Sequence, residues 1–116
     1  MRSAALTEIG REGERLTLEH EKVRTGHQPK WVSIDDNADG YDVLSVVEMS
    51  DPRPLSIEVK TSTMGVSGSF HLTRNEWETS DEAECHLFHL WTLVRDTRPM
   101  LAIVPPQEMQ KAHSRK

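Results

Sequence analysis

The chain has 116 residues, of which 35% are hydrophobic and 28% charged, and 19 acidic side chains against 14 basic ones give a net charge of −5. This composition predicts a single globular domain over residues 1–116, long enough for one modest core and too short for two. The negative charge disfavours tight non-specific binding to nucleic acid, which depends on neutralising phosphates. It does not exclude a metal-dependent nuclease, because such an enzyme must carry acidic residues at its metal site.

The sequence also indicates the compartment. No apolar run approaches the roughly 20 residues needed to cross a bilayer, and the first 14 residues lack the uninterrupted apolar segment of a signal peptide. The single cysteine, Cys85, cannot form an internal disulfide, which favours a reducing compartment. We therefore expect a cytoplasmic protein without a membrane partner.

A helix is predicted over residues 3–24, because apolar side chains recur near one stripe and Glu and Arg fill the opposite face. Gly10 and Gly13 interrupt it, each at a cost of about 1 kcal/mol relative to Ala, so their spacing suggests that another element packs closely on that side. Gly26 is expected to cap the C-terminus. The predicted apolar stripe consists of Ala5, Ile9, Leu16 and Val23.

Three strands are predicted next. Residues 31–35 and 41–49 are two of them, separated by the turn-forming loop DNADG. The segment SDPRP, residues 50–54, is predicted to be a turn, because two prolines so close together rule out a β-ladder. The stretch LSIEVKTST, residues 55–63, then returns beside the second strand as a hairpin.

The second half of the chain is predicted to add one helix and two strands. After the loose GVSG and a short extended SFHLT, Thr73 is an expected N-cap, and Glu76 completes a capping box. The order helix, three strands, helix, two strands predicts an α/β fold, a mixed β-sheet flanked by helices. The predicted ranges are helix 74–84, strands 86–94 and 99–104, and a flexible basic tail over about 107–116.

Glu58 and Lys60 are two residues apart on one strand, so their side chains project from the same face. They are either a solvated ion pair, which contributes little to stability, or half of an active site. If Met49 pairs with Leu55, paired positions sum to an even number, and Asp42 shares the face of Glu58 and Lys60.

The same pairing would place Asp42 opposite Ser62. A shifted register, a bulge or a strong twist is therefore needed to bring the carboxylates of Asp42 and Glu58 together. Glu14 on the first helix follows the small residues that would let helix and sheet approach each other. Three carboxylates suit Mg²⁺, which activates water and offsets charge on a phosphate, and Lys60 adds a compact positive charge.

This pattern resembles the PD-(D/E)XK nuclease superfamily, the restriction-endonuclease-like fold, in which an acid opens one strand and a (D/E)-X-K triplet lies on its hairpin partner. Asp42 matches the acid, and Glu58-Val59-Lys60 matches the triplet. Glu14 matches an acid on the first helix of several branches, including archaeal Holliday-junction resolvases. Tyr41 stands where the superfamily has its proline.

The resemblance is closest to the domain called protein NO VEIN C-terminal, seen in plant proteins and in many bacterial restriction or defence proteins. It spans roughly residues 9–104. The domain's motifs look like G..GE, GYD, EVKT and LT.NEW in that order, and here they fall at residues 10–14, 40–42, 58–61 and 72–77.

The resemblance implies a Mg²⁺- or Mn²⁺-dependent endonuclease that cleaves DNA in a restriction or defence setting. Asp42 and Glu58 would be the principal metal ligands, Glu14 would assist through water or a second ion, and Lys60 would orient the attacking water. A homodimer or a larger complex would supply recognition. The alternative is a catalytically inactive domain that keeps the fold as a DNA-binding or protein-interaction module.

Three further residues are candidate phosphate contacts. Arg74 and Asn75 open the second predicted helix, whose N-terminus could hold a backbone phosphate; helix capping is the alternative interpretation. Thr61 follows Lys60 and either hydrogen-bonds a phosphate or simply ends the strand.

Overall fold

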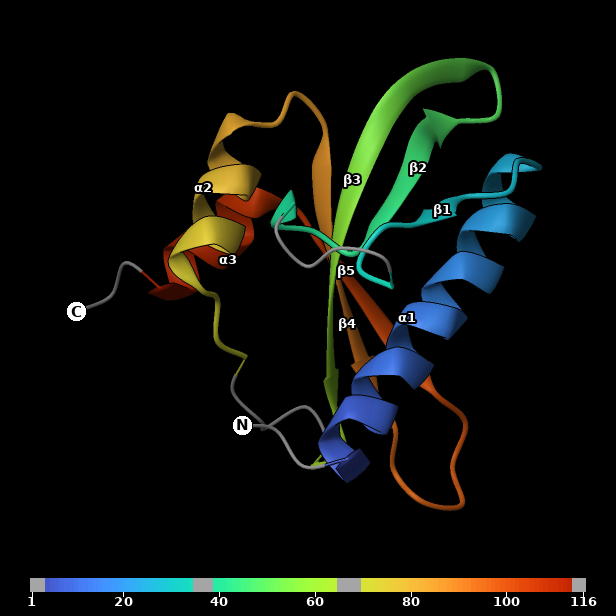
Figure 1. Ribbon diagram of the computed structural model, residues 1–116, viewed down its shortest axis with the longest axis vertical. Coiled ribbons are helices and arrows are strands. Elements are labelled where there is room, and N and C mark those ends of the chain that lie inside the picture. Colours follow the sequence, from blue (N-terminus) through green and yellow to red (C-terminus); the bar gives the residue numbers. More distant parts are fainter. Residues whose placement is uncertain (1–3, 35–38, 65–69, 114–116) are drawn as a thin grey trace.

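A five-stranded sheet separates helix α1 on one face from helices α2 and α3 on the other (Figure 1). The computed structural model describes residues 4–34, 39–64 and 70–113. None of the described helices is long and apolar enough to cross a membrane. The elements are α1 (Ala4–Thr25), β1 (Lys30–Trp31), β2 (Val43–Glu48), β3 (Asp51–Ser62), α2 (Arg74–Glu82), β4 (His86–Thr92), β5 (Met100–Val104) and α3 (Pro106–His113).

The strands lie in sequence order, β1-β2-β3-β4-β5. Neighbouring strands are antiparallel except β3 and β4, which are parallel because the connection through α2 crosses over one face of the sheet. The predicted class, an α/β fold with a mixed sheet flanked by helices, is confirmed.

The hairpin of β2 and β3 has the predicted parity but a different register. Leu55 pairs with Ser45 rather than with Met49. Paired positions still sum to an even number over most of the hairpin, so the parity prediction is confirmed and the pairing prediction is wrong. Continued to the residue before β2, the observed register brings Asp42 level with Glu58.

The register differs because the segment SDPRP is not a turn. β3 begins at Asp51, and the turn is the dipeptide Met49-Ser50 before it. Pro54 pairs with Val46, whereas β4 joins the other side of β3 only from Ser56 onward. The first residues of β3 therefore lie at an edge, where a proline loses no ladder hydrogen bond.

Helix α1 buries a polar stripe, which corrects the predicted apolar one. Val23, assigned to the apolar stripe, is 85% exposed. The buried polar groups have partners: Trp91 Nε1 donates to Thr17 Oγ1 over 2.8 Å, and Ser45 Oγ donates to Glu21 Oε1 over 2.7 Å. Satisfied in this way, polar side chains tolerate burial. The buried stripe consists of Gly13, Thr17, Glu21 and Thr25.

The core lies mainly between α1 and the sheet, where odd-numbered strand residues face the helix. Leu16 and Leu18 of α1 pack against it. On the opposite face, Phe88 of β4 is fully buried and Met109 of α3 is nearly so. The core cluster between α1 and the sheet consists of Val43, Leu55, Ile57, Val59 and Trp91.

Helix α3 replaces most of the tail that was predicted to be flexible. Pro106 occupies the first helical position, where its missing N–H costs nothing and its fixed φ suits the helix. Met109 anchors the helix with only 6% of its surface exposed. The Pro-Pro pair before an amphipathic run was the signal for this helix. Residues 114–116 lie outside the described part of the chain.

The predicted helix caps are confirmed. Gly26 ends α1 with φ 76°, and its N–H donates to the Lys22 carbonyl over 2.8 Å. Thr73 and Glu76 form the complete capping box of α2. Strand β1 is shorter than predicted. The end of that predicted strand and most of the following loop, residues 35–38, lie outside the described residues, as do the loop residues 65–69 and the side chain of Ala5.

Candidate active site

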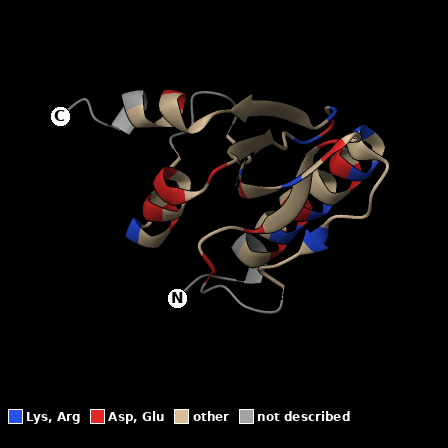
Figure 2. Cartoon of the chain, turned by 90° about the horizontal axis from the view of Figure 1, so that it is seen from above, with Lys and Arg blue, Asp and Glu red and all other residues tan. Residues whose placement is uncertain are grey.

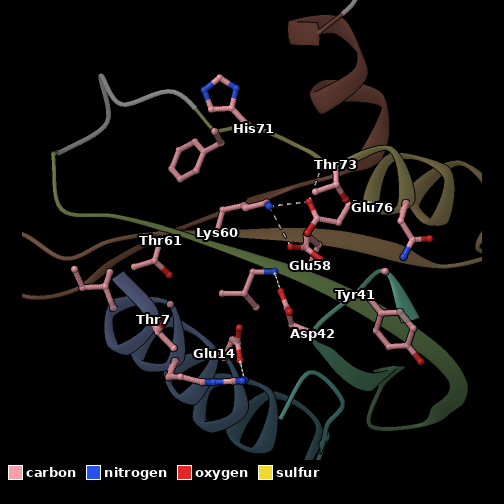
Figure 3. A pocket seen from close by; sticks show the side chains of 17 residues that line it. Thr7, Glu14, Tyr41, Asp42, Glu58, Lys60, Thr61, His71, Thr73 and Glu76 are labelled. Atoms are coloured by element: carbon pink, nitrogen blue, oxygen red, sulfur yellow. Dashed lines mark hydrogen bonds and ion pairs between the residues drawn. The ribbon is translucent and has the colours of Figure 1, made fainter. Parts of the chain in front are cut away.

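A cavity of about 650 Å³ opens beside β3, next to the start of β2, where β3 continues beyond its last pair with β2. From Glu58 to Ser62, β3 pairs with β4 and, among the described residues, with no strand on its other side. This gap in the sheet lets α1 on one face and α2 on the other line the same cavity (Figure 3).

Asp42 and Glu58 meet in this gap. The Val59 N–H has no strand partner there and donates instead to Asp42 Oδ2 over 2.8 Å. The Asp42 carboxyl also shares a hydrogen bond with the Glu58 carboxyl. Glu58 is only 3% exposed. The two predicted metal ligands are therefore in direct contact, as the observed register requires.

Burial and neighbouring negative charges raise the pKa of both carboxyls in this pair. Burial, with further repulsion from Asp42, raises the pKa of Glu58 to about 10. Burial, with repulsion from Glu14, raises the pKa of Asp42 to about 6. At neutral pH and without a metal ion, Glu58 therefore keeps its proton and donates a hydrogen bond to the Asp42 carboxylate.

Lys60 lies on the same face of β3 as Glu58, and its amine contacts two carboxyl groups. Its Nζ lies 2.8 Å from Glu76 Oε1 and 3.4 Å from Glu58 Oε2. Burial lowers the pKa of the Lys60 amine, but Glu58 and Glu76 raise it by more, so the net direction is upward. Lys60 is thus a charged ammonium group at the wall of the cavity.

Glu76 is a site residue to which the sequence analysis gave a capping role and a place in the motif LT.NEW, but no role in the site. Its Oε1 accepts from the Thr73 N–H over 3.0 Å and from Lys60 over 2.8 Å. The capping-box spacing placed Glu76 in the first turn of α2. Which side of that turn faces β3 depends on how α2 docks, and no local pattern encodes the docking.

Glu14 points from α1 toward Asp42 (Figure 3). Its Oε1 accepts hydrogen bonds from Trp31 Nε1 over 2.7 Å, from Ser33 Oγ over 2.8 Å and from Arg11 Nη1 over 3.0 Å. Glu14 therefore lies at the cavity, as expected, but its bonds are to these donors, and its effect on Asp42 is that of a nearby negative charge.

Two glycines allow the helices to approach the site. A Cβ at Gly13 would lie 2.0 Å from Thr61 Oγ1, so glycine lets α1 pack against β3 here, and the predicted close packing is confirmed at Gly13. Gly10 instead lies at the cavity wall. Gly40, with φ +79°, would place a Cβ 2.1 Å from Thr79 Oγ1 of α2. The residues before Asp42 are therefore packed directly against α2.

Two of the three candidate phosphate contacts line the cavity, and the third does not. Thr61 lines the cavity, but its hydroxyl is buried near Gly13 and hydrogen-bonds none of the described residues. Asn75 lines the cavity at the start of α2. Arg74 is exposed and does not belong to the cavity wall.

The family model described as Protein NO VEIN, C-terminal, matches residues 13–104. The chain belongs to this family. No curated protein and no solved structure matches it significantly. The matched range runs from Gly13 to Val104, so the NO VEIN C-terminal domain contains every carboxylate of the cavity described above, whereas α3 lies beyond it.

The carboxyl pair of this NO VEIN C-terminal domain fits a divalent cation. Four carboxyl groups and two permanently basic groups, Arg11 and Lys60, line the cavity among the described residues. A hydrogen bond joins the side chains of Asp42 and Glu58, and a cation in its place could neutralise both carboxylates. Over the described ranges, no group of three or more His, Cys, Asp or Glu side chains is placed to hold a metal ion. Two carboxylates with water completing the shell is a usual arrangement for Mg²⁺.

Proposed function

We propose that this NO VEIN C-terminal domain is a restriction-endonuclease-like nuclease that hydrolyses phosphodiester bonds in DNA with Mg²⁺ or Mn²⁺. The observation that carries the proposal is the contact between the half-buried carboxyl of Asp42 and the buried carboxyl of Glu58, with Lys60 two residues further along the same strand face. Placement in the PD-(D/E)XK superfamily is part of the proposal. It is supported by the hairpin with its acid and E-V-K triplet, and by the α2 crossover to a parallel strand.

Each residue has a definite task in this reaction. Asp42 and Glu58 would hold the cation through their carboxylate oxygens, with the Glu58 proton released to solvent. The cation, when bound, lowers the pKa of water and offsets the charge that develops on the phosphate. Lys60 orients the attacking water and stabilises the negative charge of the transition state. Glu14, whose Oε1 already accepts three hydrogen bonds, would hold a water near Asp42.

DNA is expected to approach over α1 rather than over α2. In Figure 2, the charged side chains of α2 are acidic except at its start, whereas basic and acidic side chains are interspersed on α1. Phosphates are therefore repelled more strongly by α2 than by α1. Asn75 at the cavity wall is the remaining candidate phosphate contact. A restriction or defence role in the cytoplasm, with a homodimer or larger complex supplying recognition, completes the proposal.

The test is cleavage of supercoiled, single-stranded and branched DNA with Mg²⁺ or Mn²⁺. We expect Asp42→Asn and Lys60→Ala each to lower turnover by at least about 100-fold, because each removes a group that acts on the transition state. Glu78→Gln and Lys22→Ala, two exposed positions away from the cavity wall, are matched controls expected to retain wild-type turnover.

Cleavage that survives both Asp42→Asn and Lys60→Ala would eliminate this assignment of the site. If the wild type neither cleaves any of these substrates nor binds Mn²⁺ in a calorimetric titration, the domain is a DNA-binding or protein-interaction module instead. The net charge of −5 disfavours tight binding to phosphates and is the observation that favours the protein-interaction alternative.

A further inference from the structure

We infer that Glu76 is a positioning residue, which holds the Lys60 ammonium group at the cavity and also contacts the Glu58 carboxyl. The inference rests on the proposed function, but the contacts that carry it exist in the protein without a metal ion. Glu76 lies on α2, across the cavity from α1. It falls in the family motif LT.NEW but not in the acid and E-V-K pattern to which the nuclease chemistry is assigned.

The Lys60 side chain needs an anchor of this kind. A lysine ends in a point charge on a flexible four-carbon stem, so its position is not set by its own geometry. Here the side chain is 17% exposed, and Glu76 provides the shorter of its two carboxylate contacts, 2.8 Å against 3.4 Å for Glu58. Glu76 is therefore the stronger restraint on the Lys60 amine.

The contact with Glu58 also weakens when that residue is needed elsewhere. Once Glu58 gives its oxygens to a divalent cation, the cation attracts the same carboxylate and repels the Lys60 ammonium group. Glu76 is outside the proposed ligand pair, so its contact persists. It keeps the ammonium group beside the reacting phosphate when Glu58 can no longer do so.

The scaffold holds Glu76 in place for this task. Its Oε1 accepts from the Thr73 N–H over 3.0 Å, while its own N–H donates to Thr73 Oγ1 over 3.1 Å. The helix that carries it is packed against Gly40, two residues before Asp42. One docked helix thus couples the position of Lys60 to that of the carboxyl pair.

The capping box supplies a matched pair of variants. Thr73→Ala and Glu76→Ala each remove one side-chain half of the box, so both weaken the start of α2. Only Glu76→Ala removes the partner of Lys60, because Thr73→Ala leaves the Glu76 carboxylate and its backbone donor. A difference between the two variants therefore reports on the contacts of Glu76 with Lys60 and Glu58 and not on helix capping. The NMR signal of the Lys60 ammonium group then isolates the contact with Lys60.

The first measurement is a ¹H–¹⁵N NMR spectrum of lysine ammonium groups in the metal-free protein, in which only groups protected from exchange with water give signals. We expect a Lys60 signal, assigned by its loss in Lys60→Arg, in the wild type and in Thr73→Ala. It should be lost in Glu76→Ala. If that variant does not fold, Glu76→Gln keeps the capping box without the charge and should weaken the signal in the same way.

The second measurement is Mn²⁺-dependent cleavage. We expect kcat of Glu76→Ala to fall by about 10- to 100-fold, the usual effect of losing a group that orients a catalytic residue, with KM for DNA little changed. Equal effects of Thr73→Ala and Glu76→Ala, or a Lys60 signal that survives in Glu76→Ala, would overturn the inference. If the wild type does not cleave DNA, only the proposed function is contradicted, and the NMR signal of Lys60 still tests the role of Glu76.

Discussion

At the scale of single residues, the most informative group is the Glu58 carboxyl. A buried carboxyl is commonly neutralised by a basic partner, yet the ammonium group of Lys60 is closer to Glu76 than to Glu58. Burial and Asp42 keep Glu58 protonated instead, with a pKa of about 10. The folded chain thus holds a proton where the proposed function requires a cation, which links metal binding to proton release.

This protonation predicts how the stability of the metal-free protein depends on pH. Unfolded Glu58 ionises near its ordinary pKa of 4.5, whereas folded Glu58 does so near 10. Its proton therefore stabilises the fold fully below pH 4.5, and this stabilisation is lost as pH rises toward 10. Between pH 6.5 and 9 the free energy of unfolding should fall by up to about 1.4 kcal/mol per pH unit.

Urea unfolding in EDTA at several pH values from 6.5 to 9 measures this slope. Glu58→Gln keeps a neutral donor for Asp42 and has no proton to lose, so its stability should be nearly flat over the same range. Parallel slopes for the wild type and Glu58→Gln would show that Glu58 is ionised in the folded protein.

At the scale of elements, the site depends on where strands end and on how closely helices approach. Because β2 begins only at Val43, after Asp42, a backbone N–H of β3 is left for the Asp42 side chain. α1 then reaches β3 through Gly13, which stands directly against Thr61. Without that approach, Glu14 could not lie near Asp42.

A double-mutant cycle tests the approach of α1 to β3. Gly13→Ala should destabilise the fold by about 1–3 kcal/mol, because the new Cβ would lie 2.0 Å from Thr61 Oγ1 and overpacking outweighs the gain in helix propensity. Thr61→Ala removes that oxygen, so it should recover part of the loss in the double variant. Chemical denaturation of the four proteins gives the coupling, and purely additive effects would mean that the contact is not close.

At the scale of the whole molecule, polar side chains tie the two layers together on the α1 face. His89 of β4 is fully buried, and its Nδ1 lies 3.0 Å from Thr17 Oγ1 of α1. Its Nε2 has no hydrogen-bond partner among the described residues and faces Glu21 Oε2 at 4.0 Å. The interface between α1 and the sheet therefore contains a buried histidine that is neutral in the folded protein.

Low pH should weaken the packing of α1 on the sheet, because it favours protonation of His89 in the unfolded chain. Burial lowers the pKa of His89 to about 4, while unfolded His89 titrates near its ordinary 6.5. The folded protein then binds fewer protons, so the contribution of His89 is present above pH 6.5 and is lost as pH falls to 4. The loss amounts to up to about 3 kcal/mol.

Urea unfolding at pH 6.5, 5.5 and 4.5 compares the wild type with His89→Gln. The variant should lose less stability than the wild type on acidification, whatever its stability at pH 6.5. An equal loss in both proteins would show that His89 is not the group whose protonation opposes folding.

Much of the fold was predictable because it follows local rules. The caps at Gly26 and Thr73 depend on a few neighbouring residues, and both are confirmed. The prolines of SDPRP misled the prediction, since their effect depends on whether a strand lies on their far side. The polar stripe of α1 was invisible because its partners lie on β2 and β4, far away in the sequence.

The amino-acid order alone determined the family motifs, the element types and the common strand face of Glu58 and Lys60, because side-chain alternation along a strand is a property of the strand itself. Only the tertiary structure decided that Asp42 lies level with Glu58 and that Glu76 holds Lys60. A register and a helix docking depend on the contacts of many distant residues at once, and no short stretch of sequence contains them.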